Sequence, residues 1–155
     1  MIESVYTEAG AGPGELAAVR DAFRRAGFEV EVEAVVLRRS ARVVLPWIVS
    51  VTLTVPIAAW FTAFAVESGK LAAQDTHAAV KAFVKGIFAA RQDAGSGRGA
   101  LDLEDPEGSH VSLTSDVPEE ALDALGGIDW DEARGGYLTW DPAERKWLDP
   151  MKRRT

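Results

Sequence analysis

The stretch VVLPWIVSVTLTVPIAAWFTAFAV, residues Val43–Val66, decides how this chain of 155 residues folds. It contains no Asp, Glu, Lys, Arg or His, and most of its side chains are apolar. An apolar stretch of this length is not left in water. It is therefore expected to be buried in a lipid bilayer, in a protein core or against a partner.

The length of the stretch permits a membrane span, because a helix of ~20 apolar residues crosses roughly 30 Å of hydrocarbon. Trp47 and Trp60 would then lie at membrane interfaces. A single span would, however, put residues 1–42 and residues 67–155 on opposite sides of the membrane. The first piece is too small to bury its own apolar surface, so a protein core is the favoured interpretation.

The interior of the stretch favours a strand followed by a helix. Residues Val51–Val55 alternate between apolar side chains and threonine, which is typical of a strand. Pro56 suits the first position of a helix. We expect a buried strand near Val49–Val55 and a long helix that runs from Pro56 to about Phe88.

Upstream of the stretch the pattern predicts a βαβ unit. Ile2–Thr7 alternates weakly, and the glycine-rich run Gly10–Gly14 ends that strand and opens a helix. The helix has one apolar face and stops at Gly27. Glu29–Leu37 begins with period two and becomes continuously apolar, as a strand entering a core does.

Downstream, the second part of the long helix carries an apolar stripe of Val80, Phe83, Val84, Ile87 and Phe88, with Lys81, Lys85 and Arg91 assigned to the opposite side. The polar, glycine-rich segment 92–99 reads as a flexible linker.

Two hairpins and a short helix complete the pattern. The first hairpin pairs Ala100–Glu104 with His110–Thr114, and its turn is Asp105–Gly108. Asp116 and Glu119 resemble a capping box for the short helix. The closing hairpin, Tyr137–Trp140 with Lys146–Leu148, brings Trp140 and Trp147 together.

These elements predict a single α+β domain over residues 1–155 with a mixed sheet. Its parts are a βαβ unit (1–42), the apolar segment with the long helix (43–91), the linker (92–99) and an acidic hairpin–helix–hairpin (100–150).

Charge is unevenly distributed within the net charge of −7. Residues 100–150 hold three basic and fourteen acidic side chains, whereas residues 1–42 hold six and seven. The acidic half disfavours nucleic acid as a partner, because phosphate binding needs clustered Lys and Arg. The absence of cysteine excludes disulfides and thiolate chemistry. The first residues lack the pattern of a signal peptide, so a cytoplasmic location is expected.

The residues that usually carry chemistry form no recognisable set. His77 and His110 lack metal-ligand or triad spacing. Gly10–Gly14 matches neither the dinucleotide fingerprint nor the P-loop. The acids Asp102, Glu104, Asp105 and Glu107 do not follow the EF-hand pattern and read as solvated strand and turn residues. We therefore predict no catalytic residue, no cofactor and no metal ligand.

The preferred functional hypothesis is a non-enzymatic protein–protein interaction or assembly module, with a protein partner or self-association. It would use the apolar segment and an acidic, aromatic C-terminal surface. The candidate interaction residues are Arg38, Arg39, Arg42, Trp47, Trp60, Tyr137, Trp140 and Trp147. The alternative is a small membrane-associated effector or regulator that inserts Val43–Val66, with the arginines against anionic lipid. An enzyme of unknown class ranks third, and no small-molecule ligand is specified.

Overall fold

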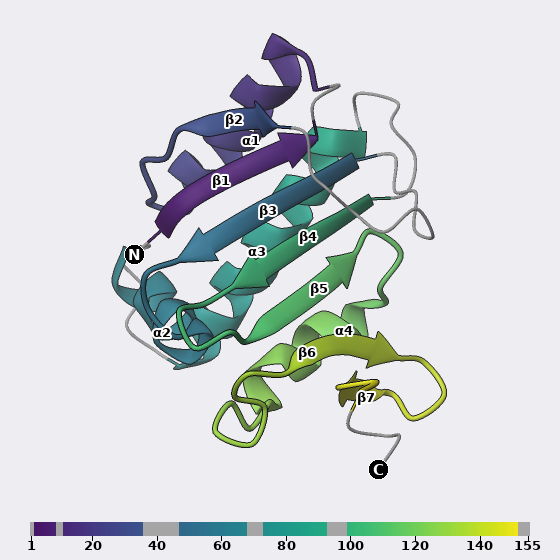
Figure 1. Ribbon diagram of the computed structural model, residues 1–155. Coiled ribbons are helices and arrows are strands. Elements are labelled where there is room, and N and C mark those ends of the chain that lie inside the picture. Colours follow the sequence, from purple (N-terminus) through teal and green to yellow (C-terminus); the bar gives the residue numbers. More distant parts are fainter. Residues whose placement is uncertain (1, 9–10, 36–46, 68–72, 93–98, 152–155) are drawn as a thin grey trace.

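Strands from both halves of the chain form one mixed sheet in the computed structural model, which describes residues 2–8, 11–35, 47–67, 73–92 and 99–151 (Figure 1). The strand order is β2-β1-β3-β4-β5-β6-β7. The strands are β1 (Ile2–Glu8), β2 (Val32–Val35), β3 (Trp47–Leu53), β4 (Gly99–Glu104), β5 (His110–Thr114), β6 (Tyr137–Asp141) and β7 (Lys146–Leu148).

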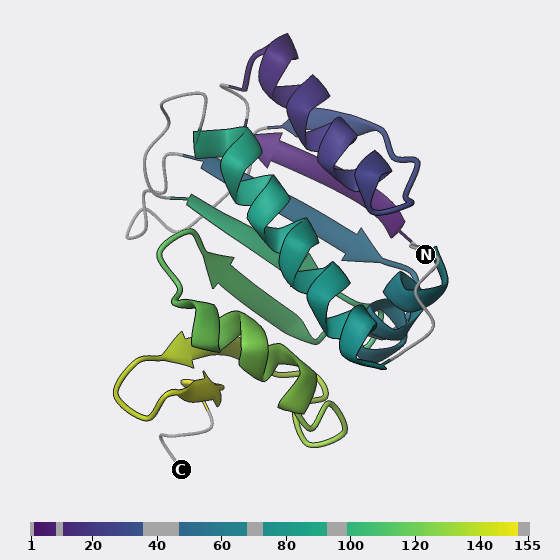
Figure 2. The ribbon, with the colours of Figure 1, turned by 180° about the vertical axis from the view of Figure 1, so that it is seen from behind.

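The helices lie on one side of this sheet. They are α1 (Pro13–Arg25), α2 (Ile57–Glu67), α3 (Ala73–Gln92) and α4 (Glu119–Asp123), followed by a 3-10 turn at Ala124–Gly127. Figure 2 shows α1, α3 and α4 in front of the sheet, and Figure 1 shows the opposite face without a described helix across it.

The predicted α+β class is confirmed by these elements. β1 and β2 are parallel neighbours joined through α1, which is the predicted βαβ unit. β4 pairs with β5 and β6 pairs with β7 as antiparallel hairpins, and Trp140 lies directly opposite Trp147. Segment 93–98 of the predicted linker lies outside the described residues, while Gln92 belongs to α3 and Gly99 to β4.

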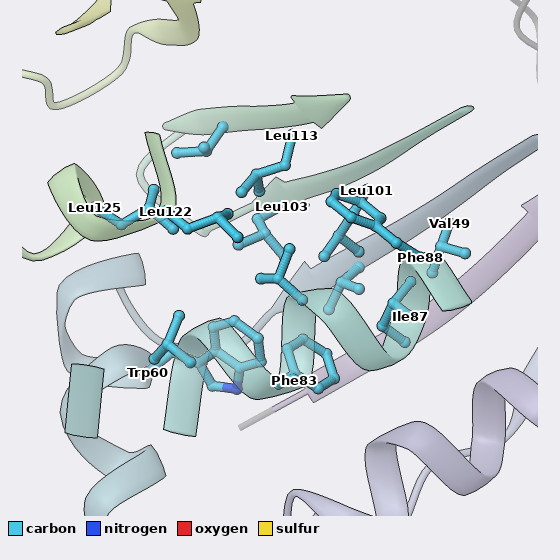
Figure 3. Close-up of a cluster of buried hydrophobic side chains, with 14 of the residues drawn as sticks. Val49, Trp60, Phe83, Ile87, Phe88, Leu101, Leu103, Leu113, Leu122 and Leu125 are labelled. Atoms are coloured by element: carbon cyan, nitrogen blue, oxygen red, sulfur yellow. The ribbon is translucent and has the colours of Figure 1, made fainter. Parts of the chain in front are cut away.

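The described part of the apolar stretch contributes one buried face to the core, as predicted, whereas its residues Thr54, Ala59 and Thr62 are exposed. β3 lies between β1 and β4, and its residues Trp47, Val49, Val51 and Leu53 are at most 1% exposed. Trp60 of α2 is fully buried against the same core, which Figure 3 shows between the sheet and the helices. Residues 43–46 lie outside the described part of the chain.

The predicted long helix is two helices that pack against each other. The ring centroids of Trp60 in α2 and Phe83 in α3 lie 5.8 Å apart. In one continuous helix these residues would be separated by roughly 34 Å, at 1.5 Å per residue. The apolar pattern continues across both helices, but Gly69, a poor helix former, stands between them in the sequence.

The predicted capping box of the short helix is wrong. α4 begins at Glu119, the extended residue Pro118 holds the N-cap position, and no side chain caps the helix. Proline fixes φ near the value that this position needs, so the chain enters the helix two residues later than Asp116 suggests. A carboxylate does fold back at the start of α1, where Glu15 accepts the amide of Gly12.

Gly99 begins β4 where the backbone passes directly against the Trp47 ring. A Cβ atom on Gly99 would lie 2.1 Å from the ring carbon Cδ2 of Trp47, which is fully buried. We expect Gly99→Ala to destabilise the fold by ~3 kcal/mol, the upper range for overpacking, because neither backbone nor ring has space to move. Thermal unfolding followed by circular dichroism measures this loss.

Gly14→Ala is the matched control for this prediction. A Cβ atom on Gly14, within α1, would meet no atom within 4 Å. Alanine is the better helix former, so this variant should be unchanged or stabilised by about 1 kcal/mol. Equal melting temperatures for the two variants would contradict the close approach of Gly99 and Trp47.

Candidate functional site

The candidate site is the sheet face that no described helix covers. The sheet register places one apolar row on the helix side: Val32, Val5, Val51, Leu103, Val111 and Leu138. Side chains alternate along a strand, so the residues on either side of this row point to the other face. They form two polar rows, namely Glu33–Tyr6–Ser50–Asp102–Ser112 and Ser4–Thr52–Glu104–His110–Tyr137.

These polar rows carry negative charge without positive charge. Strands β1 to β6 contain no lysine or arginine, and the two rows contain the acids Glu33, Asp102 and Glu104. The same strands also contain Glu3, Asp141 and Glu8, of which Glu8 pairs with Arg91 of α3. Positive charges lie instead on the helices, including Arg24 of α1 and Lys81 and Lys85 of α3. The fold therefore separates an acidic sheet face from a helical layer of mixed charge.

The lysines of the helical layer form ion pairs with acids of the same layer. Lys81 Nζ lies 2.9 Å from Asp123 Oδ1 and 3.4 Å from Glu119 Oε2, and Lys85 also contacts Glu119. Hydrogen bonds from Lys85 and Lys81 hold the pKa of Glu119 below its ordinary value. Glu119 and Asp123 are therefore neutralised locally.

A shallow cleft of about 340 Å³ opens on the acidic face where β1 and β2 begin. Its walls are Ile2 to Tyr6 of β1 and residues 29–31 and 33 of the second strand region. Four glutamates line it: Glu3, Glu29, Glu31 and Glu33. Glu29 pairs with Arg24 at 3.2 Å, whereas the other three make no ion pair with a described residue.

His110 and Tyr137 form the aromatic part of this face. Their ring centroids are 5.7 Å apart, and His110 Nε2 lies 3.5 Å from Glu104 Oε1. Tyr137 is 42% exposed. These two aromatic side chains stand at the end of the second polar row, next to the Glu104 carboxylate.

The acidic turn of the β4–β5 hairpin has a structural role. Asp105 is buried, and its Oδ1 accepts the amides of Glu107 and Ser109 at 3.0 and 2.9 Å. Its Oδ2 accepts the amide of Ile57 at 3.1 Å, which fixes the start of α2 against the turn. Three amide donors thus occupy this carboxylate, so Asp105 has the predicted turn role but is buried rather than solvated. Within the described segments, no group of three His, Asp or Glu is placed to hold a metal ion.

A second charged cluster is buried at the end of α3. Arg91 is 1% exposed, contacts the Glu8 carboxylate, lies 3.3 Å from Glu15 and stacks over the Trp47 ring at 5.8 Å. Burial lowers the pKa of Arg91. The cluster connects β1, α1 and α3. At the N-terminus of α1, where an anion could bind the free backbone amides, the Glu15 carboxylate already accepts the amide of Gly12.

The predicted interaction residues fall into three groups. Trp47 and Trp60 are fully buried, so they offer no surface to a partner. Trp140 and Trp147 pack edge to face at 5.7 Å, and Trp147 Nε1 donates to the Ala121 carbonyl of α4, which holds the last hairpin against that helix. Tyr137 alone lies on the exposed sheet face, and Arg38, Arg39 and Arg42 lie outside the described residues.

The other predictions concern the membrane span and the two histidines. Among the helices that the structure describes, none is both long and apolar enough to cross a bilayer. The side chain of His77 is not described, and His110 is placed beside Glu104 and Tyr137 as above. Comparisons with protein-family models, curated proteins and solved structures returned no match for this chain.

Sequence reasoning missed both charged groups that the structure assembles. Arg91 was assigned to the polar side of its helix, yet it lies four residues after Ile87 and seven after Val84, which puts it on the apolar stripe. The absence of lysine and arginine from β1 to β6 can be seen in the sequence once the strand bounds are known. The alignment of the acids on one face depends on the register between the strands.

Proposed function

We propose that this protein is a binding module that presents its acidic sheet face to a positively charged protein. The observation that carries the proposal is the charge segregation: six neighbouring strands contain no lysine or arginine, and four of them contain carboxylates, on a face without a helical cover. Electrostatic complementarity selects the partner and speeds association.

The composition of the face supports a protein partner over a small metabolite. The rows consist of Ser, Thr, Tyr, His and carboxylates spread across six strands, which suits an extended contact with many weak polar interactions. The cleft at β1 and β2 is shallow, and its volume lies near the lower end of the range of ligand pockets.

Neutralising the exposed glutamates of the face tests the proposal. The variant Glu3→Gln, Glu33→Gln, Glu104→Gln removes three charges from exposed positions on three strands. We expect it to bind a fluorescent nonalysine peptide roughly tenfold more weakly at low salt, since each charge contributes about 0.5 kcal/mol at ~7 Å in water. Fluorescence anisotropy measures the affinity.

The matched control removes three charges from the helical layer, in the variant Asp21→Asn, Glu120→Gln, Asp123→Asn. Both variants have the same net charge, and surface ion pairs such as those of Asp21 and Glu120 contribute little stability. The control should bind nearly as tightly as the unmodified protein. Equal weakening in both variants would mean that only the total charge matters, and the proposal would fail.

A further inference from the structure

β2 is a terminal strand of the sheet and pairs on one side with β1. Along the described chain no backbone group of β2 bonds to a strand on its other side. A strand edge of this kind is a template for another extended chain, and charged residues on it exclude unsuitable partners.

The charge of this edge selects its partner. Glu31 and Glu33 are exposed, and both line the cleft on the acidic face. A second copy of β2 would bring like charges together, so these glutamates oppose self-pairing at this edge. The other terminal strand, β7, has only three residues, and its Lys146 pairs with Glu144, so it offers a cationic chain a shorter edge with its own cation beside the glutamate.

The cleft lies beside this edge on the acidic face. A chain added to β2 would direct alternate side chains to that face, next to Glu31, Glu33 and the cleft walls at Glu3 and Tyr6. The intervening side chains would point to the helix side, where Val32 is partly buried and Ala34 is exposed. In the added chain, the acidic face favours lysine or arginine, and the helix side favours apolar residues, so the two kinds of residue would alternate.

We propose that the partner binds as an extended segment of alternating cationic and apolar residues, added as a strand to β2, with a lysine or arginine side chain in the Glu3–Glu31–Glu33 cleft. This inference rests on the proposed function and specifies how the acidic face is used. Main-chain hydrogen bonds to β2 supply affinity, and the glutamates supply specificity.

The test uses a labelled heptapeptide of alternating lysine and valine and the full-length protein. Two further peptides carry N-methyl groups either on every lysine or on every valine. Alternate amides of a strand point to opposite edges, so strand addition loses binding by roughly tenfold or more with one methylated peptide and retains it with the other. Amide hydrogen exchange should slow at residues 32–35 when the unmodified peptide is added, and stay unchanged at residues 146–148.

Single variants locate the contact. Glu33→Gln should weaken binding of the unmodified peptide more than Glu104→Gln, which removes an exposed carboxylate from β4 in the middle of the same face. Equal binding of both methylated peptides, or an equal effect of the two variants, would overturn strand addition while leaving an acidic binding face. Absence of binding by the unmodified peptide, or equal weakening by the helical-layer control variant, would overturn the proposed function itself.

Discussion

Val51→Asp is expected to unfold the protein or to lower its stability by about 5 kcal/mol. Val51 is 1% exposed and lies in the interior strand β3, between Val5 of β1 and Leu103 of β4. The variant loses the apolar burial of valine, worth ~2 kcal/mol, and places a carboxylate among apolar side chains. Urea unfolding followed by tryptophan fluorescence measures the loss, with the soluble yield as a second readout.

Thr52→Asp is the matched control on the next residue of the same strand. Thr52 points to the opposite face, where the new carboxylate meets water as well as the neighbouring Glu104. Repulsion between exposed charges costs about 1 kcal/mol or less. Similar losses in the two variants would show that β3 does not have one buried face and one open face, and both proposals would lose their basis.

Local patterns predicted the elements well, because each depends on residues close in sequence. The turn Asp105–Gly108 is an example: its glycine has the positive φ of 80° that the pattern requires, and the two strands pair around it. The strand within Val43–Val66 was likewise visible from its alternation. Pro56 also marked the start of the next helix to within one residue.

Long-range arrangement was not predictable from the same patterns. The apolar positions of α2 and α3 form one uninterrupted helical pattern, and only the contact of Trp60 with Phe83 shows that the chain folds back. The two polar rows depend on the register of strands that are distant in the sequence. A shift of one residue in any pair would exchange the two faces, so no local signal could assemble the acidic surface.

Arg91→Met is expected to destabilise the protein by about 3 kcal/mol. Arg91 is buried between β1, α1 and α3, and its guanidinium group neutralises Glu8 and Glu15. Methionine fills much of the same volume, but it leaves two carboxylates without their cation in a largely dry site. Both carboxylates keep about a quarter of their exposure, so the loss falls at the lower end for breaking a buried pair. Urea unfolding again measures the change.

A double-mutant cycle separates the charge effect from packing. Adding Glu8→Gln to Arg91→Met removes one uncompensated carboxylate. The double variant should therefore lose about 1–2 kcal/mol less stability than the two single variants lose in total. Lys85→Met on the exposed side of the same helix breaks only a surface ion pair and should cost less than ~1 kcal/mol. Strict additivity in the cycle, together with equal losses at Arg91 and Lys85, would mean that the guanidinium does not neutralise Glu8. A smaller loss of stability in the double variant would instead show that Arg91 neutralises Glu8. Arg91 would then be the charge that holds the end of β1 against α1 and α3, behind the acidic sheet face.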